Sequence, residues 1–363
     1  MKLGVIGLGS RLASMVEEFK KADPSLHLVG IVDPNEDRVR ERLPEAFFNG
    51  TTFYASLAEM MAAIKPDALA IGTRCDLHTA YATEAAPYGL PVYLEKPVAI
   101  SLAQAKTLEQ TFSEHPCEVV VGFPLRTSPL LQKAKEILDR GVLGRLEHVL
   151  AVNYVPYGDV YFNSWYRDVS VTGGLFLQKA THDLDAMMAL VGSPIVQVAA
   201  TASWGRVHQD QRAAAGGPQD GSVLYFENIG TPETGMNEDA SNALLTFENG
   251  VQGVYTQVFY SRRGAAQRGM TLSGAKATLR FDWYENELKL IHHYEPFVET
   301  ITPDEGLTHF GGDEVLSRNF IEVVAGKAAS LAPLSAGLES VYACLAARTS
   351  AQEARFVPVE RLT

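Results

Sequence analysis

Short apolar runs alternate with amphipathic stretches over the first third of the chain. Continuous apolar runs separated by helical patterns of ~10–15 residues are typical of buried parallel strands joined by helices. The predicted strands are 2–6, 27–32, 52–54, 67–71, 91–94 and 118–122, and the predicted helices are 11–22, 36–43, 56–64, 77–87 and 101–113. The pattern predicts a doubly wound parallel α/β sheet of about six strands that ends near Gly122.

The pattern changes after Gly122. A helix is predicted at 129–140, a strand at 145–154 and a helix at 178–191, and β-branched runs beyond residue 194 predict hairpins at turns such as 248–250. These strands are 195–204, 241–248, 251–259, 268–273, 276–281, 286–293 and 296–301, with closing helices at 311–325 and 335–355. Residues 205–240 are polar and rich in Gly and Pro, which indicates a surface loop or a partly disordered segment. We therefore expect two domains, at 1–122 and 123–363, the second being α+β with a large, mostly antiparallel open sheet.

Composition and charge narrow the functional classes. The net charge of -12 argues against a nucleic-acid partner, because phosphates repel such a surface. No apolar run approaches the ~20 residues that a membrane span needs. Cys75, Cys117 and Cys344 are scattered, which predicts neither a disulfide nor a metal site and fits a cytoplasmic protein.

The turn after the first strand carries the first chemical signal. Gly7 and Gly9 would let the backbone turn tightly and approach a pyrophosphate at the start of the next helix. Leu12 stands where a third glycine would complete the motif, so the fingerprint is incomplete. The residues expected to line this part of a dinucleotide site are Gly7, Gly9, Ser10, Arg11 and Leu12.

Asp33 ends the second predicted strand. A carboxylate there would accept hydrogen bonds from the adenosine ribose and repel a 2′-phosphate, which favours NAD over NADP. The alternative is a turn aspartate before Pro34 and Asn35. Arg38 lies close enough in sequence to accommodate a phosphate, so it is also a candidate cofactor contact.

Two later strand ends add further candidates. The loop after strand 67–71 holds Thr73 and His78, which we expect to cover the nucleotide, with Asp76 as a helix N-cap. Strand 91–94 runs into Glu95, Lys96 and Pro97. Ligands of open α/β sheets bind outside the carboxyl ends of the strands, so Lys96 would face the crevice rather than be an ordinary solvated lysine.

The segment 154–167 is rich in aromatic residues. Tyr154, Trp165 and Arg167 offer ring planes, a hydroxyl and a guanidinium that suit a sugar ring with apolar C–H faces and hydroxyl groups. The alternative is an aromatic minicore beneath a long loop.

A double glycine at 173–174 precedes the predicted helix 178–191. Gln178 and His182 are four residues apart and would share one face, with Asp185 placed to orient the imidazole. Lys179 and Asp183 are also four apart, which is most simply interpreted as a surface ion pair worth a few tenths of a kcal/mol.

These features together resemble the glucose–fructose oxidoreductase / inositol dehydrogenase / rhizopine catabolism (Gfo/Idh/MocA) family nearly end to end. The motifs that carry the resemblance are Glu95-Lys96-Pro97, Gly122-Phe123 with Arg126 and Pro129, Gly173-Gly174 with His182 and Asp185, and the closing segment from Ser335. The resemblance implies an N-terminal Rossmann domain, a nicotinamide cofactor, and a sugar or cyclitol substrate. It also implies an open C-terminal sheet that forms the contact in a homodimer or homotetramer.

By this resemblance Lys96 and His182 are the catalytic residues, and Gln178, Lys179 and Arg126 are expected to bind substrate. Gln178 stands where many members carry an aspartate, and an amide cannot transfer a proton as a carboxylate can. Lys179 is a candidate to supply charge instead. Two alternatives to a dehydrogenase remain: an enzyme that retains its cofactor and cleaves a glycoside through transient oxidation, and a non-catalytic NAD-binding regulator.

Overall fold

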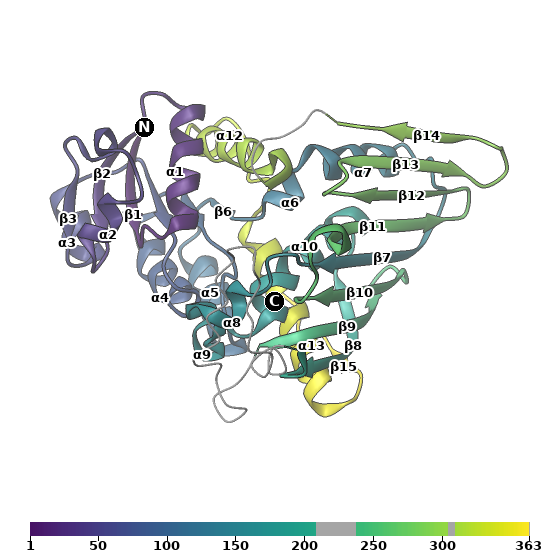
Figure 1. Cartoon of the computed structure of the whole chain (residues 1–363). Helices are drawn as coiled ribbons and strands as arrows, with labels where there is room; N and C mark the ends of the chain where they lie inside the picture. Colours follow the sequence, from purple (N-terminus) through teal and green to yellow (C-terminus); the bar gives the residue numbers. More distant parts are fainter. Residues whose placement is uncertain (208–236, 304–308, 363) are drawn as a thin grey trace. The chain divides into compact units, whose positions relative to one another are not determined.

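A computed structural model of the chain describes residues 1–207, 237–303 and 309–362 (Figure 1). The chain divides into two compact units. The first unit contains Met1–Ser128, Gly306–Val341 and Leu362–Thr363, and the second contains Pro129–Glu305 and Tyr342–Arg361. The predicted division at 122/123 assumed two contiguous domains, whereas in the structure the segment 306–341 belongs to the first unit.

The first unit is built on a six-stranded parallel sheet in the order β3-β2-β1-β4-β5-β6. Its strands are β1 (Lys2–Ile6), β2 (His27–Val32), β3 (Thr52–Tyr54), β4 (Ala68–Ile71), β5 (Val92–Leu94) and β6 (Val119–Val121). The strand order reverses between β1 and β4, and ligands of such sheets bind at the carboxyl ends beside this point. The predicted doubly wound sheet is confirmed.

The helices that connect successive strands are α1 (Ser10–Ala22), α2 (Glu36–Arg40), α3 (Leu57–Ala63), α4 (Cys75–Ala85) and α5 (Leu102–Glu114). The unit also contains α6 (Pro124–Thr127), which follows β6, and α12 (Gly312–Val324) from the later segment. Ser56 and Ser101 begin α3 and α5 by accepting a backbone N–H three residues on. Phe320 of α12 packs against Phe19 and Tyr93, with ring centroids 4.9 and 5.7 Å away. The late segment therefore completes the core of this unit.

The second unit contains a nine-stranded sheet in the order β14-β13-β12-β11-β7-β10-β9-β8-β15. Its strands are β7 (Leu146–Tyr154), β8 (Ile195–Trp204), β9 (Glu238–Phe247), β10 (Gln252–Val258), β11 (Gln267–Gly274), β12 (Ala277–Asp282), β13 (Glu287–His292), β14 (Val298–Ile301) and β15 (Val357–Pro358). Neighbours pair antiparallel except β7 and β10, so the predicted mostly antiparallel sheet is confirmed.

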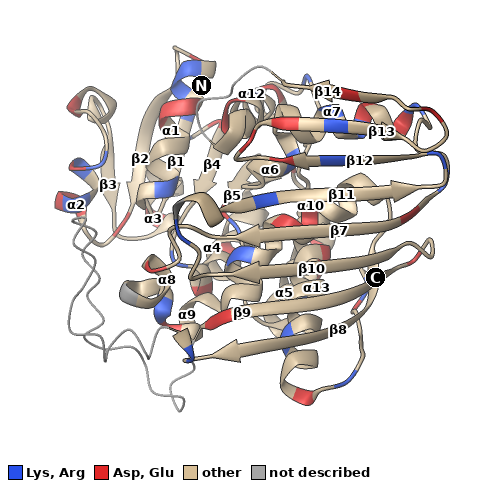
Figure 2. Ribbon diagram, turned by 45° about the vertical axis from the view of Figure 1, so that its right-hand side comes forward, with Lys and Arg blue, Asp and Glu red and all other residues tan. Residues whose placement is uncertain are grey.

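Helices of this unit are α7 (Pro129–Asp139), α8 (Val160–Asn163), α9 (Val169–Thr172), α10 (Thr181–Val191) and the greater part of α13 (Leu334–Glu353). Figure 2 shows α7 and α10 against one face of the sheet. Side chains of β10 alternate between buried and less buried positions, as expected when one face is covered. Most of the predicted segment 205–240 lies outside the described residues.

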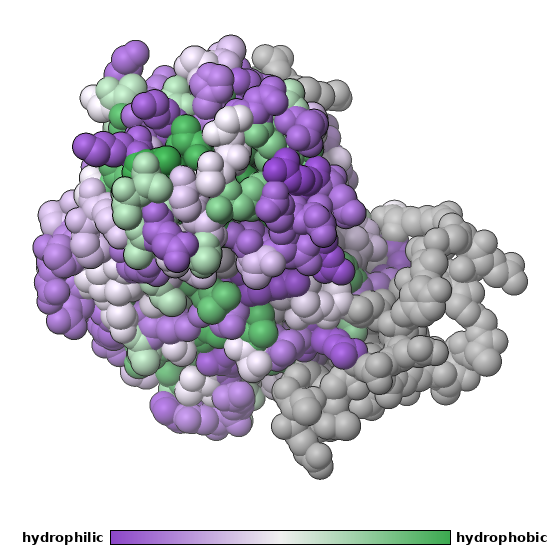
Figure 3. Space-filling model, turned by 90° about the vertical axis from the view of Figure 1, so that its left-hand side faces the viewer, coloured by the Kyte–Doolittle hydropathy of each residue, from purple (hydrophilic) through white to green (hydrophobic). Residues whose placement is uncertain are grey.

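The surface shown in Figure 3 carries mainly hydrophilic side chains, with apolar residues in small separate groups. Among the helices that the structure describes, none is both long and apolar enough to cross a membrane.

Candidate functional site

The glycine turn after β1 is shaped for close approach. Gly7 has φ +73°, and a Cβ there would lie 2.5 Å from Thr73 Cγ2. Gly9 is the N-cap residue of α1, whose first turn has neither a side-chain cap nor an acidic residue. A helix start of this kind suits a phosphate group, because its N–H groups and the helix dipole favour negative charge.

Leu12 is buried although it stands at the third-glycine position of the fingerprint. The third glycine of the motif allows close packing of helix and strand. Here the room comes from the strand side instead, since a Cβ on Gly72 would lie 2.6 Å from Leu12 Cβ. The incomplete fingerprint is thus compensated by a glycine at the end of β4.

Asp33 supports the glycine turn directly. Its Oδ2 accepts the Leu8 N–H at 3.0 Å, and its Oδ1 accepts the Asn35 N–H at 2.9 Å. The turn-aspartate role is therefore present, and each carboxylate oxygen keeps a lone pair for a ribose hydroxyl.

Sequence reasoning missed Arg42, which lies beyond α2 and donates from Nη1 to the Leu8 carbonyl. Arg38 is exposed on α2. No local pattern marks Arg42, because its target is 34 positions away.

The guanidinium of Arg11 interacts with two carboxylates of the protein, those of Asp313 and Glu95. Its guanidinium donates to both oxygens of Asp313 at 2.7 and 2.5 Å, and Arg11 Nε lies 3.4 Å from Glu95 Oε1. Burial alone would raise the pKa of Asp313, but hydrogen bonds from Arg11 and His309 outweigh it and hold that pKa well below its usual range. Arg11 thus ties the glycine turn to the end of β5 and to α12.

Glu95 is buried at the carboxyl end of β5 and accepts the Tyr93 hydroxyl at 3.1 Å. A Cβ on Gly122 would lie 2.9 Å from Glu95 Oε2, so glycine is required beside this carboxylate. Lys96 follows at the strand end and is half-buried. The buried glutamate, held by Arg11 and Tyr93, therefore fixes the backbone from which Lys96 extends.

His78 links two loops at this edge of the sheet. Its Nδ1 lies 2.8 Å from the Pro97 carbonyl oxygen and its Nε2 lies 3.2 Å from the Thr73 carbonyl oxygen. Burial lowers the pKa of His78, with these carbonyl contacts opposing the shift. The predicted N-cap role of Asp76 is wrong, because α4 starts at Cys75 and Asp76 lies in its first turn.

In the second unit, the buried carboxylate of Glu238 accepts a hydrogen bond at the start of the helix that carries Gln178 and His182. Gly173 and Gly174 have φ +76° and +87°, and Glu238 Oε2 accepts the Leu175 N–H at 2.8 Å. Burial raises the pKa of Glu238 despite its backbone hydrogen bonds. The glycines turn the chain sharply, and Glu238 caps the N–H groups that follow.

The helix begins with a π-helical turn at Phe176–Ala180 before α10. Gln178, His182 and Asp185 are all buried within it. Turns of this kind occur frequently at functional sites. The predicted orientation of His182 by Asp185 stays a prediction.

The predicted surface ion pair between Lys179 and Asp183 is wrong. Both side chains are buried, because the helix packs on nearly every side. Asp183 instead accepts from Arg268 Nε at 2.9 Å, from Asn153 at 2.8 Å and from the Tyr255 hydroxyl at 3.0 Å. Lys179 Nζ donates to the Tyr157 hydroxyl at 2.7 Å.

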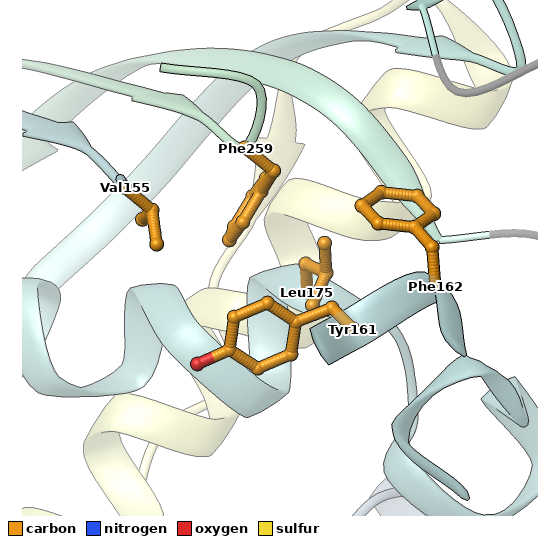
Figure 4. Close-up of a cluster of buried hydrophobic side chains, with 5 residues drawn as sticks. All are labelled: Val155, Tyr161, Phe162, Leu175 and Phe259. Atoms are coloured by element: carbon orange, nitrogen blue, oxygen red, sulfur yellow. The ribbon is translucent and has the colours of Figure 1, made fainter. Parts of the chain in front are cut away.

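The aromatic segment is divided between packing and surface. Figure 4 shows a buried cluster that consists of Val155, Tyr161, Phe162, Leu175 and Phe259. Part of the segment is therefore an aromatic minicore.

The three predicted substrate walls lie outside that cluster. Trp165 stacks on Tyr166 with centroids 4.0 Å apart; Trp165 and Tyr154 are half-buried and Arg167 is exposed. Arg126 is half-buried on α6 in the first unit. Their contact with substrate stays a prediction.

Comparisons with known proteins agree with this architecture. Residues 1–123 match the family model described as "Oxidoreductase family, NAD-binding Rossmann fold". Residues 131–280 match the model described as "GFO/IDH/MocA C-terminal domain".

Among curated proteins, myo-inositol 2-dehydrogenase of Thermotoga maritima is 26% identical over 254 residues, which are 70% of this chain and 67% of the relative. The scyllo-inositol 2-dehydrogenase (NAD(+)) of Bacillus subtilis is 24% identical over 235 residues, which are 62% of this chain and 64% of the relative. Matches to such relatives span between 44% and 67% of their lengths.

Two solved structures each cover 99% of this chain. Levoglucosan dehydrogenase in complex with NADH has a TM-score of 0.83 at 17% identity, with 99% of both chains covered. The WlbA dehydrogenase from Bordetella pertussis, in complex with NADH and UDP-GlcNAcA, has a TM-score of 0.77 at 22% identity, again over 99% of both chains. At these identities the likeness shows the fold.

Proposed function

The chain belongs to the Gfo/Idh/MocA family of oxidoreductases with an NAD-binding Rossmann fold, and we propose that it transfers a hydride between NAD and a secondary hydroxyl of a sugar, a sugar derivative or a cyclitol. The observation that carries the proposal is the end of β5, where buried Glu95 is held by Arg11 and Tyr93 and sets Lys96 at the carboxyl edge of the sheet. Inositol dehydrogenases among the relatives support the substrate class.

The first unit fits NAD. The Gly7 cradle and the uncapped start of α1 suit the pyrophosphate, and the carboxylate of Asp33 suits the adenosine ribose. A 2′-phosphate beside that carboxylate would be repelled, so NAD is favoured over NADP. When bound, NAD supplies the hydride acceptor.

The residues of this chain then have to position an alcohol and move its proton. In our proposal Lys96 donates a hydrogen bond to the reacting oxygen or takes its proton, and His182 is the second proton-transfer group. Gln178 is buried and offers an amide that would hold a neighbouring hydroxyl but cannot accept a proton.

The buried amide of Gln178 favours one alternative, an enzyme that retains its cofactor. In this alternative a sugar hydroxyl is oxidised transiently, a substituent is eliminated, and the hydride returns to the sugar. Full cofactor occupancy after purification, together with product release and no free NADH, would favour this alternative over the dehydrogenase.

The deciding experiment is a screen of sugars, cyclitols and glycosides that follows NADH absorbance and product release in parallel. For a compound that is oxidised, we expect Lys96→Met to lower kcat/KM by at least about 100-fold, the lower range of general acid–base effects. Lys65→Met, which changes an exposed lysine, is the matched control and should leave kcat/KM unchanged. Residual activity of the Lys96 variant above about a hundredth of wild type would contradict the role.

A further inference from the structure

Arg42 makes a hydrogen bond to the backbone of the glycine turn after β1. Its own backbone is fixed just beyond α2, where its N–H donates to the Val39 carbonyl at 3.0 Å and the side chains of Val39 and Leu43 are buried. From there the half-buried guanidinium donates from Nη1 to the Leu8 carbonyl. A hydrogen bond with a charged donor is roughly twice as strong as one between neutral groups. A side chain from beyond α2 therefore restrains the turn.

Two side chains hold the two peptide groups of the turn between Gly7 and Gly9. Asp33 Oδ2 accepts the Leu8 N–H of the first peptide at 3.0 Å, and Arg42 donates to the Leu8 carbonyl of the second. Leu8 itself is fully buried. Each peptide plane therefore has one side chain that sets its orientation, and both side chains belong to the first unit.

The orientation of the Leu8–Gly9 peptide decides what the turn presents to an anion. In a planar trans peptide the C=O and N–H bonds point in opposite directions, so the Gly9 N–H points away from Arg42. Gly9 is the N-cap residue of α1, with φ −69° and ψ 167°. Its N–H belongs to the donors at a helix start that have no partner within the helix and that bind phosphate groups.

A flip of this peptide would reverse the arrangement. Rotation of the plane changes ψ of Leu8 and φ of Gly9, and glycine accepts φ of either sign, so Gly9 offers little resistance. The Leu8 carbonyl oxygen would then take the direction of the N–H, where its partial negative charge would repel a pyrophosphate. The flip also breaks the hydrogen bond to Arg42, so Arg42 opposes it.

We propose that Arg42 is a positioning residue for NAD, which keeps the Leu8–Gly9 peptide in the orientation that receives the pyrophosphate before the cofactor arrives; this rests on the NAD binding in the proposed function. Arg42 acts on the cofactor through the turn and takes no part in proton transfer at Lys96. A preorganised site binds its ligand more tightly, because the turn need not be ordered during binding.

The first test is the equilibrium binding of NAD, measured by isothermal titration calorimetry. For Arg42→Met we expect the Kd of NAD to rise by about 10- to 100-fold, the range for losing a hydrogen bond to a charged group. Arg42→Lys, which keeps a cation, should have a Kd between those of Arg42→Met and wild type. Arg318→Met is the control, because it removes an exposed arginine of α12, and it should bind NAD as wild type does. An unchanged Kd in Arg42→Met would overturn the proposal.

The second test observes the turn without cofactor, by nuclear magnetic resonance of protein labelled with isotopically enriched glycine. Wild type should give one sharp amide signal for Gly9, assigned by its absence in Gly9→Ala. In Arg42→Met, exchange between two peptide orientations should broaden or split this signal, and saturating NAD should restore a single one. A weakened affinity for NAD with an unaltered Gly9 signal would show that Arg42 contacts NAD directly, and would overturn the positioning role.

Kinetics with the compound that the screen identifies separate binding from chemistry. Arg42→Met should raise KM for NAD and leave kcat at saturating NAD close to the wild-type value. A fall in kcat with KM for NAD unchanged would contradict a role in cofactor binding. If circular dichroism shows that Arg42→Met does not fold, Arg42→Gln, which also removes the charge but stays polar, carries the same expectations.

Failure of this inference and failure of the proposed function are distinguishable. If wild type binds no NAD, the proposed function fails and the role of Arg42 fails with it. If wild type binds NAD and the uncharged variant binds it equally well, only the role of Arg42 is overturned.

Discussion

A methyl group at position 122 would lie 2.9 Å from Glu95 Oε2 and 3.0 Å from the Tyr93 hydroxyl. Glycine at this position is therefore required by the side chains that fix the end of β5, rather than by backbone conformation. Any movement of Glu95 would also disturb its interaction with Arg11 and the start of the Lys96 loop.

We predict that Gly122→Ala destabilises the protein by about 1–3 kcal/mol, the usual cost of overpacking, and lowers kcat/KM. Urea unfolding and steady-state kinetics would measure the two effects. Gly264→Ala is the control, because a Cβ at Gly264 meets nothing within 4 Å. Equal stability of the two variants would show that the loop accommodates the methyl group without moving Glu95.

At the residue scale, the sequence predicts those site residues whose place follows from neighbouring residues in the chain. Asp33 and Lys96 stand at strand ends, and Gly7 stands in a turn, so the strand pattern alone indicates their places. The partners that hold the site are remote: Leu175 and Glu238 are 63 positions apart, Asp183 and Arg268 are 85 apart. A hydrophobic pattern contains no information on such pairs.

At the element scale, the helix with Gln178 and His182 starts earlier and less regularly than predicted. Its periodicity indicated 178–191, whereas a π-helical turn at Phe176–Ala180 precedes α10. The residue that caps this start is Glu238, the first residue of β9. The hydrophobic pattern places the start of β9 at 241, because Glu238 and Asp239 are polar residues although both are buried.

We predict that Glu238→Gln changes how stability depends on pH. Burial raises the folded-state pKa of Glu238 above its ordinary 4.5, so the folded protein binds this proton more tightly than the unfolded chain. Its stabilising contribution is complete below that ordinary value and is lost as pH rises through the folded-state pKa. Gln cannot ionise, so the stability of the variant relative to wild type should increase with pH.

Urea midpoints of both proteins across this window would measure the difference. Glu248→Gln is the control, since Glu248 is an exposed carboxylate paired with Arg361. A Glu238→Gln difference that stays constant with pH would show that Glu238 does not titrate differently in the folded and unfolded states.

At the scale of the whole molecule, the chain returns to its first unit after completing most of the second. In the segment 306–341, Phe320 packs in the core beside Phe19, and Asp313 accepts hydrogen bonds from Arg11. The Ala332 carbonyl accepts the Val121 N–H at 2.7 Å. Sequence patterning located α12 in this segment, but it did not indicate the unit to which α12 belongs. The order of the predicted elements along the chain favours two contiguous domains. The long-range contacts show instead that the first unit combines two separate segments of the chain.

We predict that residues 1–128 alone do not fold cooperatively, because the faces of Phe19 and Tyr93 that contact Phe320 would be exposed and Arg11 would lose Asp313. Joining 1–128 to 306–341 through a flexible linker should restore a cooperative thermal transition, measured by circular dichroism, and NAD binding, measured by fluorescence.

In the joined protein, Phe320→Ala should lower the free energy of unfolding by about 3–5 kcal/mol, as for other truncations of a large core side chain. A midpoint for 1–128 alone that equals that of the joined protein would show that the contiguous N-terminal domain suffices, and that the late segment merely covers a core already complete.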